Sequence, residues 1–261
     1  MTTADVNADT NEKQLRDAWD AFTDRLNTIG HDALESAPTD VERADGIRFI
    51  LRLLAYREEQ FLEFPSGHRP ELFFAESPTR KIFADCPDTI YHQFSVAKGG
   101  VYRVTGLRGE SPYISFTAYR AGVVDRVVAD LHDGELEINA DGTFSLTVGG
   151  PDTRSNWLDL GEDAAFVIIR EYTHDRENGV KATFEVEQVS PELGHRPELD
   201  ADRIGSFLGL LGMGLSWVND ATVRLSAELR LRPNIMNEAG AELVSEMAGT
   251  PHNHYQLCYV Q

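Results

Sequence analysis

The feature that most limits the fold is a change in hydrophobic periodicity near Tyr91. From there to about residue 189, apolar and polar residues alternate, and Gly-containing turn sequences interrupt the runs roughly every 8 to 15 residues. No helical segment separates these runs. The stretch therefore predicts an antiparallel β-sandwich of jelly-roll type rather than a parallel sheet.

One turn in this stretch has the sequence of a specific hairpin. Asp141-Gly142 lies between two alternating apolar runs, residues 136–138 and 144–148. An Asp-Gly pair between such runs is typical of a type I′ turn, in which both turn residues have positive φ. We expect a type I′ hairpin here.

The flanking regions have helical periodicity instead, so the fold class is α+β. Residues 1–11 are polar and predict a disordered tail, and residues 12–87 predict a helical region. Residues 88–261 predict the sandwich domain, with a long helix over about 200–231 packed against it.

Two local patterns mark the helices. Thr39 and Glu42 have the spacing of a capping box, which starts a helix by satisfying two free backbone N–H groups. Gly205, Gly209 and Gly212 form a stripe on the C-terminal helix. Close packing of this helix on a sheet explains such a stripe best, and a floor for a flat ligand is the alternative.

The charge balance excludes some partners. The chain has 24 Lys and Arg against 43 Asp and Glu, a net charge of -19. That field repels phosphate backbones and anionic lipid, so neither nucleic acid nor a membrane is expected as a partner. The polar N-terminus has no signal-peptide pattern, and the two cysteines, Cys86 and Cys258, are expected to be free thiols, so we expect a cytoplasmic protein.

Four segments resemble a known family. They are Asp85–Tyr91, Gly100–Gly109, Asn156–Asp159 and Ile169–Tyr172. In order and spacing they are similar to the motifs of the uncharacterised family called domain of unknown function 1214. The resemblance implies a sheet-rich fold and implies no reaction. Cys86 and Arg176 depart from it, because the family pattern usually has Asn and Trp there.

Arg170 is the first candidate for a functional side chain. Residues 166, 168, 170 and 172 share one face of a predicted strand, so Arg170 and Tyr172 lie in line with two apolar residues. If this face is the core, the guanidinium needs a carboxylate or an anionic ligand. Asp88 is the predicted internal partner, and a structural ion pair is favoured over ligand binding.

Four further residues are candidates for ligand contacts. Asn156 and Trp157 combine hydrogen-bonding groups with a stacking face, which suits a sugar or a planar ring. The same residues suit a turn that closes the sandwich, and this structural interpretation is favoured. Tyr91 and Arg103 form a second polar group, although a solvated Arg on a strand is ordinary.

Metal and cofactor sites are not predicted. His252 and His254 lie at i, i+2, but a metal would need a third ligand such as His92 or His174, and no known metal spacing is present. The sequence likewise has no phosphate-binding loop and no nucleophile elbow.

The function predicted from these residues is binding of a small polar or carboxylated molecule in a cleft of the sandwich. One alternative is an enzyme of small-molecule or lipid metabolism, with Asp88, Tyr91 or a histidine as acid or base. A further alternative is an accessory subunit. Members of the resembled family often continue into another β domain, whereas an expected strand at residues 254–260 precedes Gln261. A partner β domain or a homo-oligomer would then complete the protein.

Overall fold

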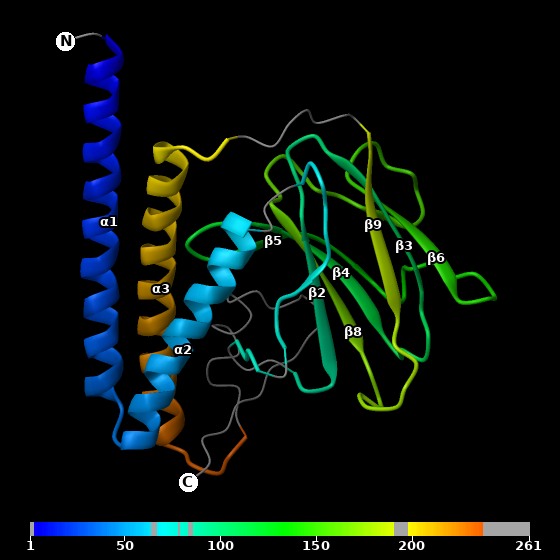
Figure 1. The fold of residues 1–261 in the computed structure, drawn as a ribbon. Coiled ribbons are helices and arrows are strands. Elements are labelled where there is room, and N and C mark those ends of the chain that lie inside the picture. Colours follow the sequence, from blue (N-terminus) through cyan, green and yellow to red (C-terminus); the bar gives the residue numbers. More distant parts are fainter. Residues whose placement is uncertain (1–2, 64–66, 78, 83–85, 191–197, 237–261) are drawn as a thin grey trace. The chain divides into compact units, whose positions relative to one another are not determined.

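The computed structural model describes residues 3–63, 67–77, 79–82, 86–190 and 198–236. The helices are α1 (Thr3–Ser36), α2 (Asp40–Glu58), the short π-helix η1 (Glu59–Glu63) and α3 (Ala201–Arg230). The strands are β1 (Phe73–Phe74), β2 (Thr89–Ser95), β3 (Val101–Leu107), β4 (Ile114–Arg120), β5 (Arg126–His132), β6 (Thr143–Val148), β7 (Trp157–Leu158), β8 (Phe166–Tyr172) and β9 (Thr183–Ser190). Figure 1 shows these elements, and together they confirm the α+β class.

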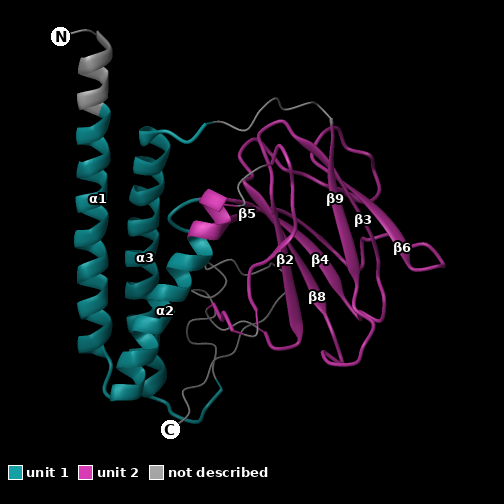
Figure 2. Cartoon of the chain, viewed as in Figure 1, with its two compact units in different colours: residues 1–57, 122–124, 197–261 teal, residues 58–121, 125–196 magenta. Residues whose placement is uncertain are grey.

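The chain divides into two compact units (Figure 2). Unit 1 joins residues 1–57, 122–124 and 197–261, and unit 2 joins residues 58–121 and 125–196. This division differs from the predicted one, because the N-terminal and C-terminal helices belong to the same unit. Among the described helices, none has the length and apolar content needed to cross a bilayer.

Unit 1 is built on the packing of α1 along α3. A Cβ at Gly205 would lie 3.6 Å from that of Ala18, and one at Gly212 would lie 3.0 Å from the Arg25 side chain. Within this unit, Gly205 and Gly212 therefore lie where α3 packs closely against another helix, α1. At Gly209 a Cβ would meet nothing within 4 Å.

The sequence predicted the start of α2 correctly, but not the start of α1. The capping box at α2 is confirmed, because the Glu42 amide donates to Thr39 Oγ1 (3.2 Å) and the Thr39 amide donates to Glu42 Oε2 (3.1 Å). By contrast, α1 begins at Thr3, where the sequence predicted a disordered tail. Extending a nucleated helix costs far less than starting one, so a polar segment can join the amphipathic helix that follows it.

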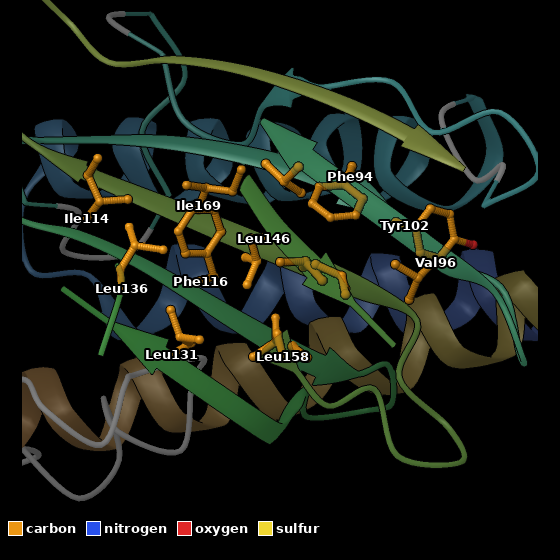
Figure 3. Close-up of a cluster of buried hydrophobic side chains, with 14 of the residues drawn as sticks. Phe94, Val96, Tyr102, Ile114, Phe116, Leu131, Leu136, Leu146, Leu158 and Ile169 are labelled. Carbon is orange, nitrogen blue, oxygen red and sulfur yellow. The ribbon is translucent and has the colours of Figure 1, made fainter. Parts of the chain in front are cut away.

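Unit 2 is a two-sheet sandwich. The first sheet, here called sheet A, has the strand order β1-β2-β8-β4-β5, and sheet B has the order β7-β6-β3-β9. The strand pairs are antiparallel, except that β6 and β7 run parallel. Side chains of both sheets meet in one apolar core, which includes Phe94, Phe116 and Ile169 of sheet A and Tyr102 and Leu146 of sheet B (Figure 3).

The turn at Asp141-Gly142 is not the type I′ turn that was predicted. Gly142 has φ 84°, but Asp141 is not among the described non-glycine residues with positive φ. The Gly142 amide donates to the Asn139 carbonyl, and the Asn139 amide donates to the Thr143 carbonyl, each at 2.9 Å. This is the three-residue loop in which a left-handed glycine follows a type I turn. Residues 136–138 before it are not a strand.

Candidate functional site

The outer face of sheet A, which points away from the sandwich core, is buried although it is rich in polar residues. The register places Tyr91, Arg170 and Ser115 in one row across β2, β8 and β4, and places Gln93, Ile168 and Thr117 in the next row. Buried polar residues on this face are Thr89, Gln93, Ser95, Ser115, Thr117 and Arg170. Buried polar groups cost free energy unless they are hydrogen-bonded, so this face needs an explanation.

Arg170 belongs to this outer face. The sandwich core contains its neighbours Val167 and Ile169, so the face of residues 166, 168 and 170, which the sequence allowed to be the core face, is not the core of the sandwich. Both faces of β8 are buried, and alternation alone could not decide between them. The side chain is nevertheless only 4% exposed, so the guanidinium is inside the protein, as predicted.

Two hydroxyl groups hold the guanidinium of Arg170. Nη1 donates to Thr117 Oγ1 at 3.0 Å, and Nη2 donates to the Tyr119 hydroxyl at 2.9 Å. Thr117 in turn donates its single hydroxyl proton to Asp130 Oδ1 at 2.5 Å. The hydroxyl of Thr117 therefore links a buried cation to a carboxylate.

Aromatic rings surround this group. The guanidinium carbon lies 5.8 Å from the ring centre of Tyr91 and 5.9 Å from that of Tyr119. Tyr119 stacks on Phe166 with centroids 5.2 Å apart and planes 12° from parallel. From η1, Phe61 meets Phe166 edge-on at 6.3 Å. Each cation–ring contact of this kind contributes about 0.5–2 kcal/mol, with the larger values at desolvated sites.

Tyr91 is held as a neutral phenol. Burial is the main cause that raises its pKa well above the ordinary value, and the nearby Glu76 carboxylate raises it further. The Cys86 amide, which donates to the phenol oxygen at 3.1 Å, and the charge of Arg170 act in the opposite direction. Tyr91 therefore suits hydrogen bonding and ring contacts rather than proton abstraction near neutral pH.

The structure does not bring Asp88, the predicted partner, to Arg170. Tyr91 is the residue opposite Arg170, and Asp88 precedes it by three positions, which is about 10 Å along an extended chain. Asp88 is exposed, and its carbonyl accepts the Thr173 amide at 2.8 Å. Tyr172 shares the face of Arg170 but packs edge-on against Tyr113 at 5.3 Å.

Trp157 lies on β7 at the edge of sheet B and Asn156 directly precedes it, and the polar side-chain atoms of both bind the backbone. Asn156 Nδ2 donates to the carbonyls of Glu137 (2.8 Å) and Ser145 (3.0 Å), and Oδ1 accepts the Glu137 amide (2.7 Å). Trp157 Nε1 donates to the Gly149 carbonyl at 3.2 Å. These bonds occupy the groups that a ligand would use, and they give both residues a structural role.

Arg103 is also outside the Arg170 group. It lies on β3 in sheet B, where its Nη1 meets Glu187 Oε1 of β9 at 2.8 Å. Both side chains are at least half exposed, so this cross-strand pair contributes about 0–1 kcal/mol.

Sequence reasoning missed Thr117, Tyr119 and Asp130. The signal for the first two was present in β4, where Ser, Thr and Tyr alternate with Ile, Phe and Ala. Such a strand has one apolar and one polar face, and the alternation alone does not show that the polar face is buried. Asp130 could be found only from the register that places it opposite Thr117.

A second group of titratable side chains lies on the inner side of sheet A. His92 Nε2 is 3.3 Å from Glu171 Oε2, and Glu171 Oε1 accepts the Ala182 amide at 2.7 Å. Glu171 is 1% exposed. The ring of His92 lies between those of Phe74 and Phe184, with centroids 5.0 and 4.8 Å away.

The two histidines considered for a metal, His252 and His254, lie outside the described residues, as does Cys258. Within the described part of the chain, no three His, Cys, Asp or Glu side chains gather closely enough to hold a metal ion.

Comparisons with known proteins support the fold. No model of a known protein family matches the chain, and no curated protein does. The crystal structure of an uncharacterized protein from Burkholderia cenocepacia is similar over 94% of this chain and 70% of its own, with a TM-score of 0.81 and 26% identity. The VPA0106 protein from Vibrio parahaemolyticus overlaps 57% of this chain and 44% of its own, at 15% identity and a TM-score of 0.33. The first of these supports a shared fold.

Proposed function

We propose that the protein binds a small polar or carboxylated molecule at the outer face of sheet A, with Arg170 as its anchor. The observation that carries the proposal is a guanidinium only 4% exposed, held in place by the hydroxyls of Thr117 and Tyr119. A fixed, desolvated guanidinium is suited to a planar carboxylate, which it can bind through two parallel hydrogen bonds. The proposed site is this outer face and not a cleft between the two sheets.

A thermal-shift screen against metabolites tests the proposal. It compares the wild-type protein with Arg170→Lys, which keeps the positive charge but loses the planar fork. Arg103→Ala is the matched control, because it removes an exposed arginine of the same unit. Carboxylated compounds should stabilise the wild type and the control, and Arg170→Lys much less. Equal stabilisation of all three proteins would show that Arg170 does not anchor the ligand and has only a structural role.

Enzymatic acid–base chemistry is the second candidate, and the contact between His92 and Glu171 favours it. A histidine oriented by a buried carboxylate is a common acid–base arrangement, whereas Asp88 is exposed and Tyr91 keeps its proton. Any turnover found in a broad substrate screen should be lost in both His92→Gln and Glu171→Gln. Activity that survives in folded His92→Gln would refute this assignment.

Finer predictions accompany the proposal. The resemblance to domain of unknown function 1214 and the jelly-roll arrangement stay predictions, as does a cytoplasmic location. The accessory-subunit alternative, with a partner β domain or a homo-oligomer, depends on residues 254–260, which lie outside the described residues. Light scattering of the purified protein would measure its oligomeric state directly.

A further inference from the structure

We infer that Asn178, in the turn between β8 and β9, is a site of spontaneous deamidation whose rate the folded protein controls through Asp175. Asn178 is the one asparagine in the sequence that precedes a glycine, here Gly179. Glycine has no Cβ, so its backbone nitrogen can approach the preceding side chain with the least hindrance. Asn178 is exposed, and the water that the reaction consumes therefore reaches it.

The reaction needs no partner other than water. The backbone nitrogen of Gly179 loses its proton to solvent base and attacks Cγ of Asn178, so that a new C–N bond closes a succinimide ring. The bond from Cγ to Nδ2 breaks, and Nδ2 leaves as ammonia. Water then opens the ring: cleavage of the new bond leaves an aspartate, whereas cleavage of the original peptide bond leaves an isoaspartate. Either product carries a carboxylate in place of a neutral amide, so the modification changes the charge.

Asp175 holds both groups that must react. The Gly179 amide donates to the Asp175 carbonyl at 3.0 Å, so the attacking nitrogen is engaged in a hydrogen bond. Asn178 Nδ2 lies 3.4 and 3.3 Å from the two carboxylate oxygens of Asp175, which turns the side chain toward that carboxylate. The Asn178 backbone amide also donates to Asp175 Oδ1, at 2.9 Å. The reaction should therefore proceed mainly when the turn opens, which is a local event that costs less than global unfolding.

The product would disturb the turn that now protects Asn178. Hydrogen bonds, chiefly the one from the Asn178 backbone amide, lower the pKa of Asp175, so this side chain is negative at neutral pH. A carboxylate on residue 178 would place a second negative charge where Nδ2 now donates, and the two charges would repel each other. The Val180 amide, which follows, donates to Glu110 Oε2 at 2.9 Å, and its carbonyl accepts the Glu110 amide at 2.8 Å. Deamidation should therefore weaken the attachment of this turn to the loop after β3.

Peptide mapping by mass spectrometry measures the reaction at Asn178, as the small gain in mass when an NH2 group is replaced by OH. Samples of the full chain are kept in mildly alkaline buffer, either native or unfolded in guanidinium chloride. Asn178 should react roughly tenfold faster in the unfolded chain, as expected if ordinary hydrogen bonds must open first. Asn139, which lies in another turn before an alanine, is the internal control and should react slowly in both samples. An unfolded chain in which Asn178 reacts no faster than Asn139 would refute the site, and equal rates in native and unfolded protein would refute control by the fold.

Two variants test the role of Asp175. Native Asp175→Ala should react roughly fivefold faster than the wild type, because its side-chain bonds are lost. Asp141→Ala is the matched control: Asp141 braces a different turn through the amide and hydroxyl of Thr143, so this variant should react at the wild-type rate. A wild-type rate in Asp175→Ala whose circular dichroism shows a native fold would overturn the role of Asp175. Hydrogen exchange needs no variant, because the Gly179 amide should exchange more slowly than in the unfolded chain, and equal exchange would also overturn this restraint.

The effect on the turn is measured on the product itself. Ion-exchange chromatography separates the deamidated protein, which has one more negative charge than the fresh protein. Its unfolding midpoint in urea should be lower. An equal midpoint would overturn the weakening of the turn, whereas the modification site is decided by the peptide mapping alone.

Discussion

Replacing Asn156 tests whether this residue is a structural brace or a ligand contact. Its amide group makes three hydrogen bonds to the backbone of residues 137 and 145, and its own backbone has φ 45°. At about 1 kcal/mol for each bond, Asn156→Ala should destabilise the protein by roughly 3 kcal/mol. Alanine also tolerates the left-handed conformation less well than asparagine, which adds about 1 kcal/mol.

Asn156→Gly is the matched variant, because it loses the same three bonds but accepts the positive φ without strain. It should therefore be about 1 kcal/mol more stable than Asn156→Ala and still less stable than the wild type. Urea unfolding followed by far-ultraviolet circular dichroism measures both differences. If Asn156→Ala costs less than about 1 kcal/mol, the bonds do not brace the turn, and a role in ligand binding would have to be reconsidered.

Three further predictions concern stability. Gly209→Ala should stabilise α3 by about 1 kcal/mol in thermal unfolding, because a Cβ at this position meets nothing within 4 Å. Gly212→Ala should be stabilised less, because its Cβ would meet the Arg25 side chain. Equal stabilisation by the two substitutions would contradict the role of Gly212 in helix packing. Gly106→Ala should cost about 1–3 kcal/mol or prevent folding, because its Cβ would lie 2.0 Å from the Thr183 carbonyl oxygen of β9. Hydrogen bonds, chiefly from the Asn178 backbone amide, lower the pKa of Asp175 below its ordinary value of 3.8. These bonds therefore stabilise the folded protein fully above the unfolded-state pKa, and their stabilisation is lost as the pH falls through the folded-state pKa. Asp175→Asn should accordingly lose less stability than the wild type on acidification below about pH 4, and parallel pH profiles would contradict this.

Features that depend on neighbouring residues could be predicted from the sequence. The capping box at Thr39 and Glu42 needs only one helical turn, and it is present as expected. The helix predicted over about 200–231 is α3, which follows the N-cap Asp200. In β3 and β6 the alternation of the sequence matches the burial, because Tyr102, Val104 and Leu146 point into the core and the residues between them are exposed or partly exposed.

Features that depend on tertiary context could not be predicted in this way. Both faces of β4 and β8 are buried, so alternation could not assign Arg170 to the outer face or identify Thr117 as its neighbour. The partner helix of the glycine stripe comes from the other end of the chain, where nothing in the local sequence marks it. The dipeptide Asp141-Gly142 occurs both in type I′ turns and in type I turns that are followed by a left-handed glycine. The sequence did not show which of the two turns would form.

On the buried outer face of sheet A, the residues that would give the highest stability differ from those that would bind a ligand. Apolar residues of similar size would bury the same area without the desolvation cost of a guanidinium and its partners, and such replacements are often neutral or stabilising. A sheet selected only for stability would therefore be expected to resemble its own inner face, where Val167 and Ile169 meet Phe116. The outer face instead holds a charge, fixes its orientation with two hydroxyls and surrounds it with rings. Substituting Arg170 with Met and Thr117 with Val together would separate the two explanations. A stable, folded double variant that no longer binds carboxylates would show that the polar groups serve binding, and a severely destabilised one would show that they serve the fold.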